Sequence, residues 1–204
     1  MEIELSKMDL VILASAHNPS IMSPEWIEKN KLLDEKYINY VNTPQFSVFE
    51  SETYNITIDQ QRLQISLKNL RSDQKSLAKI GAKYLELLPH IPYSALGLNF
   101  IWSAQIAPGE TMPEFNININ DLNISNNFQD YELELGCIVK AKKDRYLLNL
   151  SIKPSGENKL IFNFNYHFDV EPLTVTKAIE YISGLPELCD DSYHIVNKIL
   201  SGGS

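Results

Sequence analysis

The sequence predicts an α+β protein: a curved antiparallel sheet of about seven to nine strands with helices packed on one face. The order of elements approximately repeats, because residues 3–90 read as strand, short helix, three strands and long helix, and residues 95–200 as strand, irregular stretch, three strands and helices. Several strand segments also alternate apolar with polar residues, which is typical of antiparallel strands with one solvated face. We therefore expect a single domain over 1–200, made of two pseudo-repeats of the β-α-β-β-β-α kind, about 1–92 and 93–200.

The first strand is predicted from the apolar run Leu10–Ala14, which follows the alternating Ile3 and Leu5. The order Ser23-Pro24-Glu25 then predicts a helix start. Serine caps free amides, proline suits the first helical position, and glutamate favours the positive end of the helix dipole. We expect this helix over Pro24–Leu33.

Three apolar sets follow and predict three adjacent antiparallel strands. They are Phe46, Val48 and Phe49; Tyr54, Ile56 and Ile58; and Leu63, Ile65 and Leu67. A long helix is predicted over 73–88, because its apolar residues recur at helical spacing along one stripe and proline follows it at position 89. The stripe comprises Leu77, Ile80, Gly81, Tyr84, Leu85 and Leu88.

The second half is expected to follow the same scheme. Strands are predicted over Ala95–Ala104, Tyr131–Val139, Tyr146–Ile152 and Leu160–Phe168, the last with Phe162, Phe164, Tyr166 and Phe168 on one face. Two helices are then expected, about Thr176–Ser183 and Asp191–Leu200, with Gly184 as a left-handed cap between them. Residues 201–204, Ser-Gly-Gly-Ser, read as a flexible linker.

The net charge of −8 argues against nucleic acid as a direct partner, since an acidic chain repels phosphate backbones. The densest basic group, Lys140, Lys142, Lys143 and Arg145, is expected in a solvated hairpin turn over 142–145. No apolar run approaches 18 residues and the first residues do not read as a signal peptide, so we expect no membrane partner and a cytoplasmic protein.

No motif names a reaction. The sequence contains no GxGxxG, P-loop, HExxH, GxSxG or CxxC pattern, so we expect no cofactor, no metal site and no catalytic residues. Cys137 is interpreted as a buried thiol rather than a nucleophile, because no positive neighbour is evident to activate it. The acid pair Asp190-Asp191 is interpreted as a helix start, where carboxylates are favoured.

Two loops and one strand supply the candidate binding residues. His17-Asn18 and His90 with Tyr93 lie in rigid turns after apolar elements, and such loops often carry function. A turn histidine that caps a carbonyl or is simply solvated is the alternative. A further strand pattern sits in the irregular stretch and must be paired or covered, within its own sheet or by a second copy in a twofold dimer. It consists of Phe115, Ile117 and Ile119, alternating with asparagines.

Two phrases of the sequence carry a resemblance. Asn18-Pro19-Ser20-Ile21 with Pro24-Glu25-Trp26, and the stretch from Leu88 to Phe100, resemble parts of uncharacterised, sporadically distributed bacterial α+β proteins. The order of elements also resembles the duplicated saddle of TATA-binding-like and helix-grip folds. Neither resemblance implies a catalytic role, since fold does not determine function.

The leading prediction of function is a non-enzymatic protein-binding or structural subunit of a bacterial multi-protein assembly. It rests on the lack of convergent titratable groups and on strand edges that a partner can extend. The alternative is a small-ligand binder or hydrolase with a pocket between sheet and helices, using His17, His90 or Tyr93.

Overall fold

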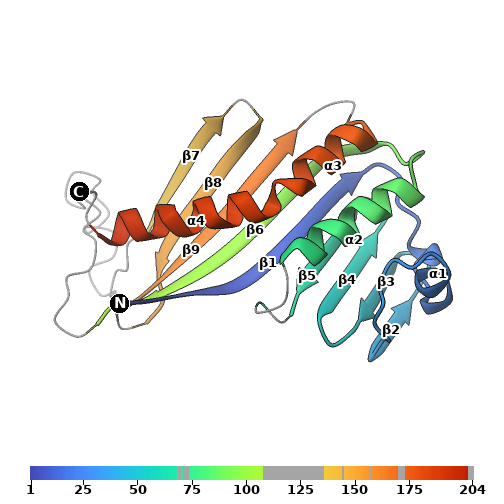
Figure 1. The fold of residues 1–204 in the computed structure, drawn as a ribbon, viewed down its shortest axis with the longest axis horizontal. Coiled ribbons are helices and arrows are strands. Elements are labelled where there is room, and N and C mark those ends of the chain that lie inside the picture. Colours follow the sequence, from blue (N-terminus) through green and yellow to red (C-terminus); the bar gives the residue numbers. More distant parts are fainter. Residues whose placement is uncertain are drawn as a thin grey trace, which may run out of the picture.

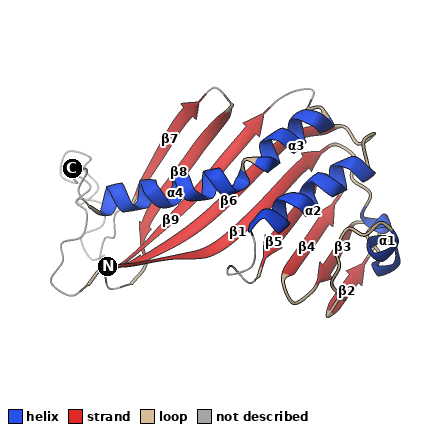
Figure 2. Cartoon of the chain, viewed as in Figure 1, coloured by secondary structure: helices blue, strands red, loops and turns tan. Residues whose placement is uncertain are grey.

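The computed structural model describes residues 1–68, 70, 74–107, 136–143, 145–156, 158–169 and 173–201. Within them the predicted α+β class is confirmed: nine strands form one open, curled antiparallel sheet accompanied by four α-helices (Figures 1 and 2). In chain order the elements are β1 (Glu2–Ala14), the 3₁₀ turn η1 (Pro19–Ile21), α1 (Pro24–Lys29), β2 (Asn39–Asn42), β3 (Phe46–Glu50), β4 (Tyr54–Asp59), β5 (Arg62–Leu67), α2 (Gln74–Leu87), β6 (Tyr93–Gln105), β7 (Cys137–Lys143), β8 (Tyr146–Pro154), β9 (Lys159–Asp169), α3 (Val175–Ser183) and α4 (Leu185–Leu200).

The strand order across the sheet is β2-β3-β4-β5-β1-β6-β9-β8-β7. The long strands β1 and β6 pair at its centre. In each half the last strand, β5 or β9, lies beside that half's first strand, and the remaining strands lie outward to a free edge. The two halves therefore share one strand order, although β2 is additional in the first half. That the halves arose by duplication stays a prediction.

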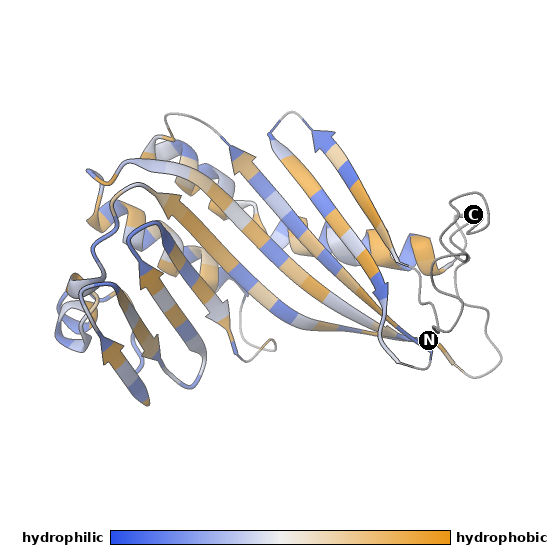
Figure 3. Cartoon of the chain, turned by 180° about the vertical axis from the view of Figure 1, so that it is seen from behind, coloured by the Kyte–Doolittle hydropathy of each residue, from blue (hydrophilic) through white to orange (hydrophobic). Residues whose placement is uncertain are grey.

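Helices α2, α3 and α4 lie across one face of the sheet, and the view from behind shows the other face without a helix over it (Figures 1 and 3). The core lies between the sheet and these helices. The predicted aromatic stripe of β9 and the apolar stripe of α2 both face it. Its strand side includes Leu10, Ile12, Leu63, Ile65, Leu98, Phe100, Phe162, Phe164, Tyr166 and Phe168, all buried.

Two close contacts fix the helices on the sheet. Gly81 lets α2 approach β1 so closely that a Cβ at this position would collide with Leu10 Cδ2. On the other half, Trp102 Nε1 of β6 donates a hydrogen bond of 2.8 Å to Ser192 Oγ of α4. Ser192 in turn donates to the Cys189 carbonyl, so this buried polar link is satisfied inside the core.

The helix boundaries differ from the sequence prediction at two places. Helix α1 ends at Lys29 rather than Leu33, because Lys31 adopts a left-handed backbone with φ of 51°. Helix α4 begins at Leu185, so the acid pair at 190–191 lies exposed within the helix and not at its start. Pro186 sits in the first turn of α4, where its missing N–H costs nothing, and Gly184 joins the two helices with an ordinary φ of −76°.

The basic group was placed wrongly by the sequence prediction. Lys140, Lys142 and Lys143 lie within β7 and pair in register with β8, whereas only Arg145 is in the turn. Strand β2 was not predicted. Among the described helices, none is both long enough and apolar enough to cross a membrane.

Candidate functional site

The structure brings two of the predicted site residues together, but in the core. His17 lies 4% exposed after β1, with its ring 6.1 Å from that of Tyr93 and 5.8 Å from that of Tyr84 of α2. His17 Nε2 is 3.2 Å from the Ile12 carbonyl oxygen, and Nδ1 is 2.9 Å from Tyr84 Oη. A carbonyl only accepts, so Nε2 carries the proton and Nδ1 accepts from the Tyr84 hydroxyl.

This arrangement ties β1, α2 and β6 together rather than presenting a reactive group. Burial lowers the pKa of His17, although its hydrogen bond to Ile12 opposes the shift, so the ring is held neutral. Burial also raises the pKa of both Tyr84 and Tyr93. Tyr93 donates its hydroxyl to the Leu88 carbonyl at 2.9 Å. His17 therefore matches the alternative interpretation, that of a turn histidine which donates a hydrogen bond to a backbone carbonyl.

The other predicted site residues are not part of this cluster. Asn18 is exposed and caps η1, accepting from the Ser20 amide at 3.1 Å and from its hydroxyl at 2.7 Å. His90 is exposed in the turn after α2. The predicted strand residues Phe115, Ile117 and Ile119 lie outside the described residues.

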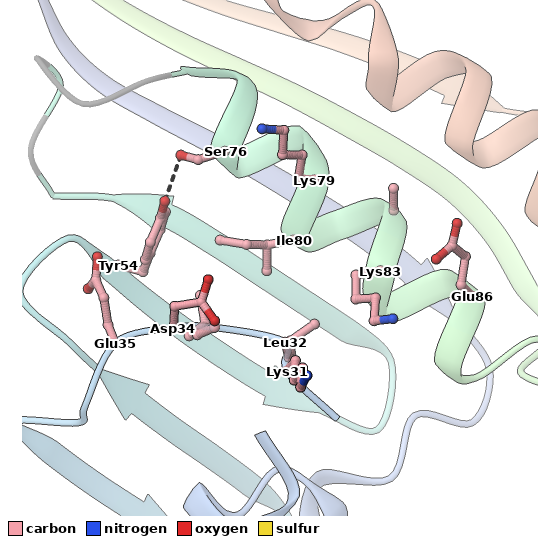
Figure 4. Close-up of a pocket in the computed structure, with 12 residues that line it drawn as sticks. Lys31, Leu32, Asp34, Glu35, Tyr54, Ser76, Lys79, Ile80, Lys83 and Glu86 are labelled. Carbon is pink, nitrogen blue, oxygen red and sulfur yellow. Dashed lines mark hydrogen bonds between the residues drawn. The ribbon is translucent and has the colours of Figure 1, made fainter. Parts of the chain in front are cut away.

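Two cavities of the described chain lie elsewhere, around the loop after α1. One, of about 630 Å³, runs between this loop and α2 (Figure 4). Another, of about 690 Å³, is lined by residues of this loop and of α1. Lys79, Lys83 and Glu86 of α2 face the first cavity, opposite Asp34 and Glu35. The three predicted residues His17, His90 and Tyr93 do not line either cavity.

The first cavity is an open groove between α2 and the loop after α1, and one of its acidic side chains is already hydrogen-bonded within the protein. Glu35 Oε2 accepts a hydrogen bond of 3.1 Å from the Thr53 amide. Partial burial raises the pKa of Glu35, but hydrogen bonds from Ser51 and Thr53 outweigh this and lower it. The groove therefore offers mixed charge to a ligand, and its described lining contains neither histidine nor cysteine.

Neither metal nor thiol chemistry stands out among the described residues. No group of three or more His, Cys, Asp or Glu side chains there is placed to hold a metal ion. Cys137 begins β7 and is half-buried, and burial raises the pKa of its thiol, which disfavours the nucleophilic thiolate.

The uncovered face of the sheet carries a row of polar side chains that runs from strand to strand. Asn165 Nδ2 donates to Asn99 Oδ1 at 2.5 Å, and Asn149 Nδ2 lies 3.4 Å from Asn165 Oδ1. Asp9, only 5% exposed, pairs with Lys7 at 2.8 Å. Read across the sheet in register, the row is Asn39, Glu50, Asn55, Ser66, Asp9, Asn99, Asn165, Asn149 and Lys140.

Replacing Asn165 with alanine is expected to lower the free energy of unfolding by about 1–2 kcal/mol, because it removes hydrogen bonds to both neighbours in the row. Asn163→Ala is the matched control, since Asn163 is exposed on the same face of β9. Urea unfolding measures both. Equal values for the two variants would show that the amide row contributes no stability.

Exposed apolar side chains gather at the two free edges of the sheet. The first edge carries Tyr37, Ile38, Val41 and Phe46, and the second carries Ile138, Val139 and Leu147. Elsewhere only Met1 and Tyr193 are large, apolar and exposed among the described residues. Since the large exposed apolar side chains concentrate there, these edges are the candidate functional sites, and they point to association with other chains.

Strand β7 is the more completely exposed of the two edges. Every side chain from Ile138 to Lys143 is exposed, with Ile138 at 71% and Val139 at 45%. Helix α4 packs against β6, and in Figure 1 most of β7 extends beyond the helix. Sequence reasoning missed this edge because it assigned the lysines to a turn, although the alternation of Lys140 and Lys142 with Val139 and Ala141 is a strand signal.

Comparison of the chain with protein-family models gives no match, and comparison with curated proteins gives none either.

Proposed function

We propose that this protein is a non-enzymatic binding subunit that docks partner proteins on the free edges of its sheet. One observation carries the proposal: exposed apolar side chains concentrate at both edges, at Ile38 and Val41 on one side and Ile138 and Val139 on the other. An uncapped strand presents backbone donors and acceptors as well, and adding a strand is a common way to bind an extended segment.

Site-specific photo-crosslinking in the host cell tests this function. A photoreactive residue at Ile138 or at Ile38 is expected to form discrete adducts with a defined partner. The same residue at Asp190, which is exposed on α4, serves as the control. Adducts of equal pattern at all three positions, or at Asp190 alone, would contradict docking at the edges.

A small-ligand role is the second candidate, and the groove beside α2 supports it. Its volume of about 630 Å³ is in the range of ligand sites, and Lys79 and Lys83 line it. Such a role would need a charged ligand, since both signs of charge face the groove. The buried positions of His17 and Tyr93 give no support to a hydrolase built on them.

A further inference from the structure

The outer side of β7 presents a regular set of backbone groups. Ser155 N donates to the Lys159 carbonyl at 2.9 Å, and this pair continues the β8–β9 register. Hydrogen-bonding direction alternates along an antiparallel strand, so the odd-numbered residues of β8 face β9 and the even-numbered ones face β7. The even-numbered residues of β8 pair with the odd-numbered residues of β7, so those residues of β7 direct their backbone groups at β8. The backbone N–H and C=O groups that point away from the sheet therefore belong to Ile138, Lys140 and Lys142.

The side chains of β7 define what can lie against it. Ile138, Lys140 and Lys142 lie on the uncovered face, while Val139 and Ala141 lie on the helix side, in register with apolar residues of β8. The chain as a whole carries a net charge of −8, yet this strand is basic. No described carboxylate pairs with its lysines, and Lys143 Nζ instead lies 5.9 Å from the centre of the Tyr146 ring.

We infer that β7 accepts an extended segment of another protein as an additional antiparallel strand, and that this segment alternates acidic with apolar residues. The inference rests on the proposed function and names the partner's chemistry. Opposite Lys142 and Lys140 the segment carries carboxylates, and opposite Ala141, Val139 and Ile138 it carries apolar side chains, since opposite charges and apolar pairs across strands stabilise a sheet. Its core then reads acidic, apolar, acidic, apolar, apolar.

A second copy of this chain does not fit the same edge through its own β7. Two copies of β7 would place six lysines, three from each, along one short ladder, and like charges facing across strands are destabilising. The competing explanation of the lysines is that they only discourage edge-to-edge pairing, a known protection of exposed strands. That explanation predicts no strand partner at all, whatever its charge.

A labelled peptide with the core Glu-Val-Glu-Val-Ile, flanked by threonines, tests the inference by fluorescence anisotropy with the full chain. We expect saturable binding that weakens at least tenfold in Lys140→Glu/Lys142→Glu. The control Lys29→Glu/Lys177→Glu makes the same charge change on exposed helix positions and should bind as the unmodified protein does. A peptide with lysines in place of its glutamates should show the reverse preference.

The backbone contribution is tested at Lys140, whose N–H points outward. Lys140→Pro removes that donor, while Lys140→Thr removes only the charge. We expect the proline variant to bind at least tenfold more weakly than the threonine variant, and circular dichroism checks that both fold. If Lys140→Pro does not fold, the comparison of the acidic and basic peptides on Lys140→Glu/Lys142→Glu still decides whether β7 binds an acidic segment.

The outcomes separate the two levels of the proposal. Crosslinking at Ile138 to a partner, with no binding of the acidic peptide, would overturn the acidic strand and leave edge docking intact. If neither peptide binds and no adducts form at the edges, both the acidic strand partner and edge docking are overturned. The lysines would then only protect the edge from pairing. Self-association seen by light scattering and abolished by Lys140→Pro would assign the edge to a second copy, which also overturns the inference.

Discussion

Replacing Gly81 with valine is expected to lower the free energy of unfolding by about 3 kcal/mol, the upper end of the usual cost of overpacking a core. A Cβ at this position would collide with Leu10 Cδ2 and lie 3.4 Å from Ile182 Cδ1. Leu10 is fully buried in the centre of the sheet, so its side chain can yield only by shifting its packed neighbours. Helix α2 would therefore be pushed away from β1 and α3. Urea unfolding monitored by circular dichroism measures the loss.

Two further variants show whether this contact is the cause. Ala82→Val adds a branched side chain on the same helix, at a half-buried position that lines the groove, and should cost less than about 1 kcal/mol. Leu10→Ala makes room at the contact, so its cost and that of Gly81→Val should add to more than the cost of the double variant. Additive costs would mean that α2 does not sit on Leu10 as described.

The same contact shows what the sequence does and does not predict. Gly81 was placed on the apolar stripe of α2 by its spacing alone, and the stripe packs on the sheet as expected. The spacing could not show that a missing side chain is required there, because this depends on which strand residue lies beneath. The alternation of Phe162, Phe164 and Tyr166 likewise predicted which face of β9 is buried, since period-two burial is a local property of a strand.

The candidate site was harder to predict, because exposure at an edge is a property of the whole sheet. The lysines of β7 resemble turn residues by composition. Both faces of that strand are exposed because most of it extends beyond α4, which the local sequence does not reveal. The helix start at Leu185 differs from the prediction because the acid pair Asp190-Asp191 resembles a helix start, whereas Pro186, which is suited to a first turn, marks the start that forms. His17 was selected by its loop position, and burial changes its role from ligand binding to packing.

Replacing His17 with alanine is expected to lower the free energy of unfolding by about 3 kcal/mol at pH 7.5, because a buried ring is removed, the buried Tyr84 hydroxyl loses its acceptor and the Ile12 carbonyl loses its side-chain donor. His90→Ala is the matched control, since His90 is exposed, and should change stability by less than about 0.5 kcal/mol. Urea unfolding at fixed pH compares the three proteins. A His17 variant as stable as the His90 variant would show that the buried hydrogen bonds contribute nothing.

The advantage of the unmodified protein over His17→Ala is expected to shrink as the pH falls from 7.5 towards 5. Burial holds the pKa of His17 in the folded chain below that of an exposed histidine, about 6.5. Between those two pKa values the unfolded chain binds more protons than the folded one, so stability rises with pH across that interval. On acidification the loss therefore begins as the pH passes through 6.5 and is complete below the folded pKa, where Nδ1 is protonated and no longer accepts from Tyr84. Unfolding measurements repeated across this pH range, together with NMR titration of the imidazole, check the direction of the change and its assignment to His17. An imidazole that titrates at or above 6.5 would contradict a neutral, buried His17. A stability difference that does not depend on pH would contradict it as well.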